Sequence, residues 1–380
     1  MTDIEFSGVS KVYPDGTGAV TELDLRIESG SFTVFVGPSG CGKTTSMRMI
    51  NRMIAPTAGT ITVAGEDISR TNPVKLRLGI GYVIQSAGLL PHRSVLDNVA
   101  TVPVLQGHTR RAARRAALEV LDRVGLDRGL AARYPAQLSG GQQQRVGVAR
   151  ALAADPPILL MDEPFSSVDP VVREELQAEM QRLQADLHKT IVFVTHDIDE
   201  AIKLGDRIAV FGRGGVLQQY DPPQTILSEP ATDFVADFVG RDRGYRGLSF
   251  RSAAGVRVHE IVTAPPEQLP ERRLEPGEWV LAVDASAHPL GWVDVSGLEK
   301  IRAGHALADC MAAGGSLFTP GGDLRQALDS AISSPSGWGV AVDDSGAVVG
   351  GVLATEVIDQ LAQQRSSEDA DRTRHHFNEE

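Results

Sequence analysis

The hydrophobic positions of the N-terminal half fall into short continuous runs separated by segments with helical spacing. Largely apolar runs occur at residues 32–36, 158–161 and 190–194, and each is followed by a glycine or a polar residue. Continuous runs of this length are typical of strands buried on both faces of a parallel sheet. Residues 46–54 follow the first run and have the character of a helix, so the pattern predicts an α/β fold.

Alternating polar and apolar positions predict a second, smaller sheet near the N-terminus. Residues 4–6 and 23–27 alternate in the manner of half-buried strands, with a turn at Pro14-Asp15-Gly16 between them. Residues 60–63 add another short strand pattern between two glycines. We expect these segments to form an antiparallel β flap.

The pattern becomes helical after residue 85. Residues 96–105 and 110–124 have helical spacing, and the second segment carries five arginines, which we interpret as a solvated face. A third helix is expected to begin at the glycine-rich segment 138–142 and to run through Ala154. These helices predict an inserted helical subdomain at about residues 86–157.

A domain boundary is predicted near residue 240. A short amphipathic helix is expected at residues 231–240, and the charged, glycine-containing segment 241–244 follows it. The first domain therefore comprises residues 1–240, and a smaller α+β module is expected at residues 244–362.

This module contains an internal repeat. Seven residues recur at one constant offset, a regularity that is hard to obtain by chance. The first set is Trp279, Ala282, Val283, Asp284, Ser286, Gly291 and Val293, and the second is Trp338, Ala341, Val342, Asp343, Ser345, Gly350 and Val352. Each copy reads as strand, turn, strand and helix, and residues 324–332 add a leading helix to the second copy. Three prolines (Pro265, Pro266 and Pro270) fall where the first copy should have that helix, so the first copy is predicted to be degenerate.

The composition is that of a globular protein of two or three domains, with 380 residues, 42% hydrophobic and 23% charged. No stretch approaches the length of a membrane span and the start has no signal-peptide pattern, so we expect a cytoplasmic chain. The net charge of −12 argues against a nucleic-acid partner. Two cysteines, Cys41 and Cys310, provide neither a disulfide framework nor a metal cluster. Residues 366–380 are rich in acids and lack apolar periodicity, so we expect a disordered acidic tail.

The segment after the first buried run fits the phosphate-loop pattern, in which two glycines with four residues between them are followed by Lys and Thr. It consists of Gly37, Pro38, Ser39, Gly40, Cys41, Gly42, Lys43, Thr44 and Thr45. Glycine lets backbone N–H groups converge on phosphate oxygens, and the helix start adds its positive dipole end. Lys43 is expected to neutralise the β- and γ-phosphates of a nucleotide and Thr44 to hold Mg²⁺. A chance glycine-rich turn is the alternative, and the strand before the loop and the helix after it argue against it.

Polar residues end other buried strands. Asp162 and Glu163 follow the run at 158–161, a costly arrangement unless a cation or ligand is present. Asp162 suits Mg²⁺, and Glu163 lies one residue further out, where it can orient or deprotonate a water aimed at the γ-phosphate. Gln85 and His196 end two further strands at the same rim, so we expect both to contact the nucleotide. A purely structural role is the alternative for His196.

Two further features point to a nucleotide. Tyr13, at the end of the first flap strand, is expected to stack on a purine base, with a core or edge aromatic as the alternative. The segment Ser139, Gly140, Gly141 and Gln142 is a second glycine-rich helix start, whose exposed N–H groups also suit an anion. One chain needs only one phosphate cradle, so the second anion site calls for an explanation.

Residues 1–240 resemble the nucleotide-binding subunit of ATP-binding cassette (ABC) transporters, with six motifs in family order. The resemblance implies an ATP hydrolase with a P-loop NTPase cassette. It implies ATP contacts at Tyr13, residues 37–45, Ser139 to Gln142 and Asp169, metal ligands at Thr44, Gln85 and Asp162, and catalytic residues at Glu163, His196 and Gln85. In this family two copies pair head to tail, and the signature of each, here 138–142, caps the ATP of the other. The loop 166–169 reads Ser-Ser-Val-Asp where the family more often has Ser-Ala-Leu-Asp, which leaves Asp169 in place.

The C-terminal repeat resembles paired cystathionine β-synthase (CBS) domains, which regulate many enzymes and transporters. Such domains often bind adenosine nucleotides through Thr-x-x-Asp, and the corresponding segments here are 296–299 and 355–358. The second of these ends in Ile358, so we expect no ribose-binding carboxylate there. Sensing of ionic strength, nucleotide binding and mere dimerisation stay open for this module.

A cassette followed by paired CBS domains resembles the ATPase of importers for osmoprotectants such as glycine betaine, carnitine and choline. The resemblance implies membrane permease subunits as partners, a solute-binding protein as an indirect partner, and a peripheral position at the cytoplasmic face of the cell membrane. The apolar loop 85–95 is expected to receive a permease helix. The alternative is a soluble cassette ATPase that acts on DNA or ribosomes, and this chain lacks the second cassette or coiled-coil insertion usual there.

Overall fold

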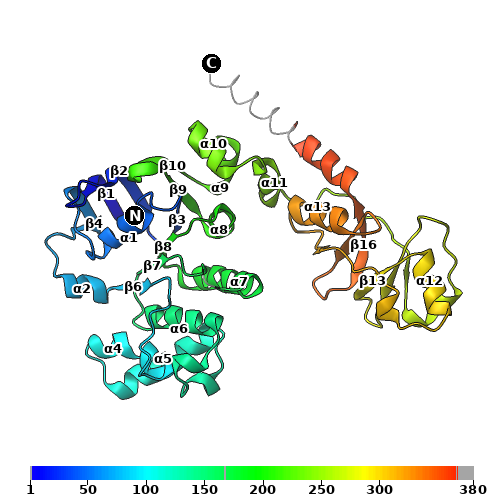
Figure 1. The fold of residues 1–380 in the computed structure, drawn as a ribbon, viewed down its shortest axis with the longest axis horizontal. Helices are drawn as coiled ribbons and strands as arrows, with labels where there is room; N and C mark the ends of the chain where they lie inside the picture. The colour runs from blue at the N-terminus through cyan, green and yellow to red at the C-terminus, as the bar shows by residue number, and fades with distance from the viewer. Residues whose placement is uncertain (1, 167, 365, 367–380) are drawn as a thin grey trace. The chain divides into compact units, whose positions relative to one another are not determined.

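The computed structural model describes residues 2–166, 168–364 and 366. It divides into two compact units, Met1–Arg241 and Asp242–Glu380, each with its own hydrophobic core (Figure 1). Apart from Ser366, the predicted tail at 366–380 lies outside the described residues, as does Ser167. Among the residues that the structure describes, no helix combines the length and apolar character that crossing a membrane requires.

A six-stranded sheet forms the centre of the first unit. It consists of β3 (Phe32–Val36), β6 (Ile80–Val83), β7 (Ile158–Asp162), β8 (Thr190–Val194), β9 (Arg207–Phe211) and β10 (Leu217–Asp221), in the order β10-β9-β3-β8-β7-β6. All neighbours are parallel except the pair of β10 and β9. Every residue of β3, β7 and β8 is buried, which explains their continuous apolar sequences. Parallel pairing places the carboxyl ends of these strands and of β6 at one edge of the sheet.

The predicted flap is a four-stranded antiparallel sheet. It consists of β1 (Thr2–Val12), β2 (Gly18–Glu28), β4 (Ala58–Val63) and β5 (Glu66–Asp67), in the order β2-β1-β4-β5. The alternation in β2 buries Leu23, Leu25 and Ile27. These side chains belong to the same hydrophobic core as the central sheet, so the flap is fixed to it.

Six helices complete the core of the first unit. They are α1 (Lys43–Ile50), α2 (Pro73–Leu78), α7 (Pro170–Leu187), α8 (Ile198–Leu204), α9 (Pro223–Ser228) and α10 (Asp233–Val239). The helix predicted at 46–54 is α1, and both of its bounds were wrong. It begins directly after Gly42, and it ends before Arg52, whose positive φ of 55° leaves the helical region.

The helical subdomain lies between β6 and β7 in the chain. It contains α3 (Val95–Val99), α4 (Thr101–Leu105), α5 (Arg110–Arg123) and α6 (Gly140–Leu152) (Figure 1). The single helix predicted at 96–105 was wrong, because Pro103 has no N–H to donate to the carbonyl of Val99, where α3 ends. The helix predicted through Ala154 ends at Leu152 instead.

Two three-stranded sheets of the same design form the second unit. One consists of β11 (Thr263–Ala264), β12 (Val280–Val283) and β13 (Pro289–Val293), and the other of β14 (Leu317–Phe318), β15 (Trp338–Val342) and β16 (Val348–Leu353). In each sheet the first pair is parallel and the second antiparallel. The helices are α11 (Arg243–Gly247), α12 (Val295–Arg302), α13 (Leu324–Ser333) and one over 354–364.

The repeated residues occupy equivalent positions in the two sheets. Ala282 pairs with Gly291 in one hairpin, and Ala341 pairs with Gly350 in the other. The φ angles of the two glycines are 159° and 152°, which residues with a Cβ rarely adopt. Residues 266–271 of the first copy form a 3₁₀ turn, whereas α13 stands at the corresponding place in the second copy.

Candidate functional site

The loop between β3 and α1 folds around the side chain of Lys43. Lys43 Nζ donates hydrogen bonds to the carbonyl oxygens of Gly37 (2.7 Å) and Pro38 (2.9 Å), and Lys43 is 4% exposed. Gly42 precedes α1 with φ of 99°, and a Cβ there would lie 2.1 Å from the carbonyl oxygen of Ala19. The loop therefore surrounds a buried cation and leads into a helix N-terminus, an arrangement that suits phosphate.

Cys41 lies inside this loop with its Sγ 3.8 Å from Lys43 Nζ. Burial raises the pKa of the Cys41 thiol, and the charge of Lys43 opposes the shift only in part. Because the thiolate is the reactive form, Cys41 is a packing residue at neutral pH.

Asp162, at the end of β7, gathers side chains from two other elements. Thr44 Oγ1 donates to Asp162 Oδ1 (2.8 Å), and Arg48 Nη2 donates to Asp162 Oδ2 (3.1 Å). The Tyr82 hydroxyl lies 3.5 Å from the same Oδ2, and burial raises the pKa of Tyr82, so the phenol stays a donor. Asp162 is 5% exposed, and these partners offset the cost of burying its charge.

Arg48 and Tyr82 were missed by the sequence analysis. Arg48 follows Thr44 by one helical turn on α1, so the two side chains share a helix face, and this spacing is a signal that the sequence contains. Tyr82 reaches Asp162 because β6 pairs with β7, with Tyr82 opposite Leu160. That pairing follows from tertiary structure and leaves no mark in the local pattern.

Glu163 and His196 lie side by side beyond the ends of β7 and β8. His196 Nδ1 is 3.1 Å from Glu163 Oε2, and the side chains are 56% and 24% exposed respectively. The Glu163 backbone has φ of 44°, and its N–H donates to the carbonyl oxygen of Val194 (2.9 Å). A residue with a Cβ is strained in this conformation, and such strain is concentrated at functional sites.

Gln85 is placed with Glu163 and not with Asp162. Gln85 Nε2 donates to Ser166 Oγ (3.1 Å), which in turn donates to the carbonyl oxygen of Glu163 (3.0 Å). Within the described residues no contact joins Gln85 to Thr44 or Asp162. The structure thus brings two of the three expected metal ligands together, and the role of Gln85 as the third stays a prediction.

Comparison with known proteins connects this geometry to a family. The ABC transporter family model matches residues 20–166. The chain is 45% identical over 310 residues to the choline transport ATP-binding protein OpuBA of Bacillus subtilis (strain 168), covering 79% of this chain and 80% of that protein. It is 40% identical over 358 residues to the osmoprotectant import ATP-binding protein OsmV of Salmonella typhimurium, covering 92% of each. The chain is an ATP-binding subunit of the ABC transporter family.

A solved structure extends the comparison to the fold of this ABC subunit. The ATP-binding cassette MJ0796, in a dimeric post-hydrolysis state bound to ADP and Pi, is 33% identical to it with a TM-score of 0.53. The alignment covers 58% of this chain and 98% of that one. The predicted P-loop cassette, ATP binding and the resemblance to ATPases of glycine betaine, carnitine and choline transporters are confirmed. The CBS resemblance of the second unit stays a prediction.

Two expected ATP contacts of the ABC subunit lie on other elements. The Tyr13 hydroxyl is 3.5 Å from Thr45 Oγ1, beside the start of α1. Ser139 caps α6: its Oγ accepts from the Gln142 amide (3.3 Å), and Gln142 Oε1 accepts from the Ser139 amide (3.0 Å). In the described chain, no contact joins Ser139, Gly140, Gly141 or Gln142 to the phosphate loop. The signature segment is therefore a rigid helix start that stands apart from the phosphate loop of its own chain.

Proposed function

We propose that this ABC subunit hydrolyses MgATP to power the import of quaternary-ammonium osmoprotectants of the glycine betaine, carnitine and choline class. The observation that carries the proposal is the gathering of Lys43, the pair Thr44–Asp162 and the pair Glu163–His196 at one edge of the central sheet. The substrate class rests on relatives named for choline and for glycine betaine, carnitine and choline transport. Those names also argue against the alternative of a soluble ATPase acting on DNA or ribosomes.

The proposed roles follow from the chemistry of each group. The Lys43 ammonium, now bonded to loop carbonyls, is in place to neutralise the β- and γ-phosphates beside the backbone N–H groups of residues 39–44. Glu163 accepts a proton from, or orients, the attacking water, and His196 holds the γ-phosphate and the Glu163 carboxylate together. Tyr13 offers its ring to the adenine.

The residues at the end of β7 fit Mg²⁺. Within the described chain no group of three or more His, Cys, Asp or Glu side chains could form an all-protein metal site. Thr44 Oγ1 and Asp162 Oδ1, 2.8 Å apart, are the hard oxygen ligands that Mg²⁺ prefers when phosphate oxygens and water complete its shell. Mg²⁺ would supply neutralisation of phosphate charge, and Thr44 and Asp162 would hold it.

A second copy of the chain is the proposed partner for the signature segment. Ser139 and Gly140 are exposed, and a Cβ at Gly140 would meet nothing within 4 Å. A helix start with an open surface, whose Gly140 and Gly141 N–H groups are not used by the capping box, suits an anion presented by another molecule. Head-to-tail pairing would bring the ATP of one copy to residues 139–142 of the other, with Asp169 at the interface.

A groove of about 300 Å³ is the proposed docking site for a permease helix, which would hold the subunit at the cytoplasmic face of the membrane. Its rim includes Met53, Val74 and Leu105, which are 52%, 64% and 66% exposed. Exposed apolar side chains around a groove suit an amphipathic helix. Arg150 also lines the groove and donates to the carbonyl oxygens of Ala87 (2.8 Å) and Gly88 (2.6 Å), in the predicted socket loop after Gln85. A solute-binding protein would act through the permease.

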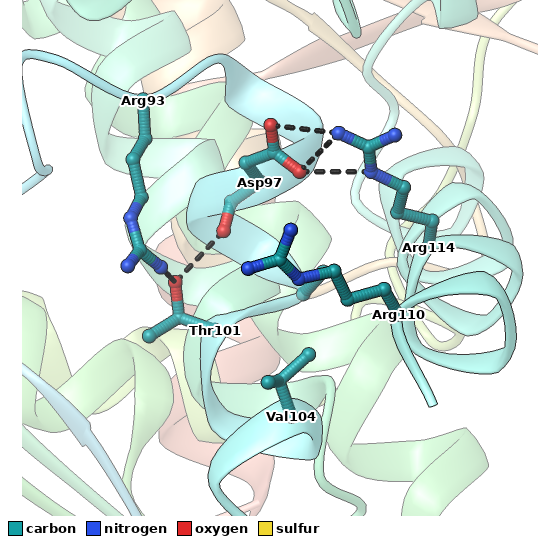
Figure 2. Close-up of a pocket in the computed structure, with 7 residues that line it drawn as sticks. Arg93, Asp97, Thr101, Val104, Arg110 and Arg114 are labelled. Atoms are coloured by element: carbon teal, nitrogen blue, oxygen red, sulfur yellow. Dashed lines mark hydrogen bonds and ion pairs between the residues drawn. The ribbon is translucent and has the colours of Figure 1, made fainter. Parts of the chain in front are cut away.

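Side chains that line another pocket, of about 220 Å³, connect the same loop to the helical subdomain (Figure 2). Arg93 Nη1 donates to Thr101 Oγ1 (3.1 Å), and the Asp97 carboxylate accepts two hydrogen bonds from Arg114 on α5. Because Arg93 belongs to the loop after Gln85, these contacts would couple movement of the loop to α3, α4 and α5. A helix in the groove would therefore sense movement at Gln85.

Replacing Met53 and Leu105 by Gln is expected to lower transport at least severalfold and to leave basal ATPase activity unchanged. Both side chains are exposed, so the change removes apolar docking surface and costs little stability. Uptake and ATPase rates of the assembled transporter provide the measurement. Ile332→Gln, at a 61% exposed position of the second unit, is the matched control. Unchanged uptake in the double variant would show that the permease helix does not dock in this groove.

The proposed function is tested by reconstituting the chain with its permease in proteoliposomes. ATP-dependent uptake of labelled glycine betaine, carnitine or choline is expected, together with substrate-stimulated ATPase activity. Labelled histidine and maltose are the control solutes. ATP hydrolysis without uptake of any quaternary amine would support the ATPase activity but refute the proposed substrate class.

The second unit is proposed to regulate the transporter. Its paired sheets repeat one hairpin geometry, as expected of paired CBS domains, and none of the proposed ATP contacts lies in it. Ionic strength is the input that we favour, because charge contacts at a surface are screened over a Debye length that falls from about 10 Å at 0.1 M salt to about 3 Å at 1 M.

Deletion of residues 242–380 is expected to leave ATP hydrolysis by the first unit within about twofold, because that unit has its own core. The salt concentration that half-activates transport should shift or disappear. Reconstituted transporter, with and without these residues, is assayed across a salt series and with adenine nucleotides. Identical activation curves with and without these residues would contradict a regulatory role and would leave dimerisation as the remaining function of the second unit.

A further inference from the structure

Glu200, on the first turn of α8, is a buried carboxylate to which the proposed mechanism gives no role. It is 7% exposed, and Thr195, which immediately precedes His196, is 2% exposed. Thr195 Oγ1 donates to Glu200 Oε2 (2.6 Å) and accepts from the amide of Asp197 (3.0 Å). One carboxylate oxygen of Glu200 is thus bonded to the residue before His196, and the Thr195 hydroxyl links this contact to the amide of Asp197 on the other side of His196.

The other oxygen of Glu200 faces α7. Gln177 Nε2 lies 3.4 Å from Glu200 Oε1, and Arg173 Nε lies 4.0 Å from the same atom. Both contacts are long for hydrogen bonds. Arg173 Nε is buried and has no hydrogen-bond partner among the described residues. This end of the contact is loose and has unused hydrogen-bonding capacity.

Arg173 continues the connection to the loop before α7. Its Nη2 donates to the carbonyl oxygen of Val168 (3.3 Å), and its amide donates to the carbonyl oxygen of Asp169 (2.8 Å). A chain of polar contacts therefore runs from Thr195 through Glu200 and Arg173 to Val168. Burying a carboxylate with one cation at 4.0 Å is costly, and apolar packing would join α7 to α8 at lower cost.

We propose that Glu200 is a positioning residue that joins the His196 loop and the Asp169 turn, so that γ-phosphate binding at His196 moves the turn presented to the second copy. The proposal rests on the roles given above to His196 and Asp169. A shift of the His196 loop pulls the Glu200 carboxylate through its firm bond to Thr195, and the loose end closes on Arg173 and Gln177. The two ATP sites of the dimer would then respond to each other.

The test compares three variants in the reconstituted transporter. Glu200→Leu removes both ends of the contact and is expected to lower kcat about tenfold to a hundredfold, the scale of a misplaced catalytic group, with KM for MgATP within about twofold. Glu200→Gln keeps an acceptor for Thr195, and the Gln177 amide can rotate to accept from its NH₂ group, so it should restore kcat to within about threefold. Glu174→Ala, at an exposed position of α7, is the control.

A double-mutant cycle with His196→Ala separates positioning from general damage. If Glu200 acts through His196, Glu200→Leu lowers single-turnover hydrolysis in the native background and has no further effect beside His196→Ala. Equal effects in both backgrounds, or an unchanged kcat in a folded Glu200→Leu protein, would overturn the proposal. Should Glu200→Leu fail to fold, Thr195→Val cuts the same contact and takes its place in the cycle. Failure of the proposed function is distinct, because native transporter would then show no coupled uptake at all.

Discussion

Replacing Glu163 by Gln is expected to lower steady-state ATP hydrolysis by about two to four orders of magnitude, the usual contribution of a general base. The change keeps the size of the side chain and its contact with His196, now 3.1 Å, but removes the proton acceptor. Lys43, Thr44 and Asp162 are untouched, so MgATP affinity should change less than about threefold. ATP that binds and is not hydrolysed should also trap the head-to-tail dimer.

The measurements are ATPase rate, equilibrium ATP binding, and light scattering on a sizing column with and without MgATP. Glu174→Gln makes the same chemical change at an exposed position of α7 and should behave as the native protein. Undiminished hydrolysis in Glu163→Gln would assign the base to another residue. Loss of ATP binding would instead give Glu163 a structural role.

Replacing Lys43 by Met is expected to weaken ATP binding about a hundredfold. The variant cannot make the charge-assisted hydrogen bonds that we expect between Lys43 and the phosphates, and two such bonds contribute about 3 kcal/mol. Lys43 is 4% exposed, and its ammonium is the donor that the carbonyls of Gly37 and Pro38 share. Methionine fills the same space but leaves these oxygens unsatisfied and brings no charge to the phosphates. The variant should therefore lose affinity for ADP as well as ATP.

Equilibrium titration with a fluorescent ATP analogue, followed by competition with ADP, gives both affinities. Lys75→Met, on the exposed face of α2, removes the same charge from the chain and serves as the control. A Kd for ATP within threefold of the native value would show that Lys43 does not bind phosphate. Melting curves verify that the altered loop still folds.

The sequence predicted those features that depend on the local residue pattern alone. Continuous apolar runs predicted β3, β7 and β8 because strands buried on both faces have no polar side. The phosphate loop was predicted from its glycines, and the structure gives the physical reason at Gly42, where φ is 99° and a Cβ would lie 2.1 Å from the carbonyl oxygen of Ala19. Asp162, Glu163 and His196 were selected as candidate site residues because they end strands of a parallel sheet, and such sheets bind ligands at their carboxyl edge.

The failures concern groups whose partners come from elsewhere in the chain. Tyr82 contacts Asp162 only because β6 pairs with β7, and Glu200 contacts Gln177 only because α7 packs beside α8. Alone in the sequence, Glu200 is one of several acids near a helix start, where an exposed carboxylate would also be favourable. The break between α3 and α4 was a different failure, since Pro103 was in plain view and its missing donor was overlooked.

The ion pair between Arg48 and Asp162 bears on how the site chooses its metal. Asp162 already shares its charge with a guanidinium at 3.1 Å and a hydroxyl at 2.8 Å, so it offers a solitary divalent cation little net attraction. The triphosphate carries most of the negative charge that a small hard cation seeks. We therefore expect a metal ion and the nucleotide to bind as one complex, in which ATP would set the preference among cations. Without nucleotide, the subunit would then respond little to changes in free divalent cations.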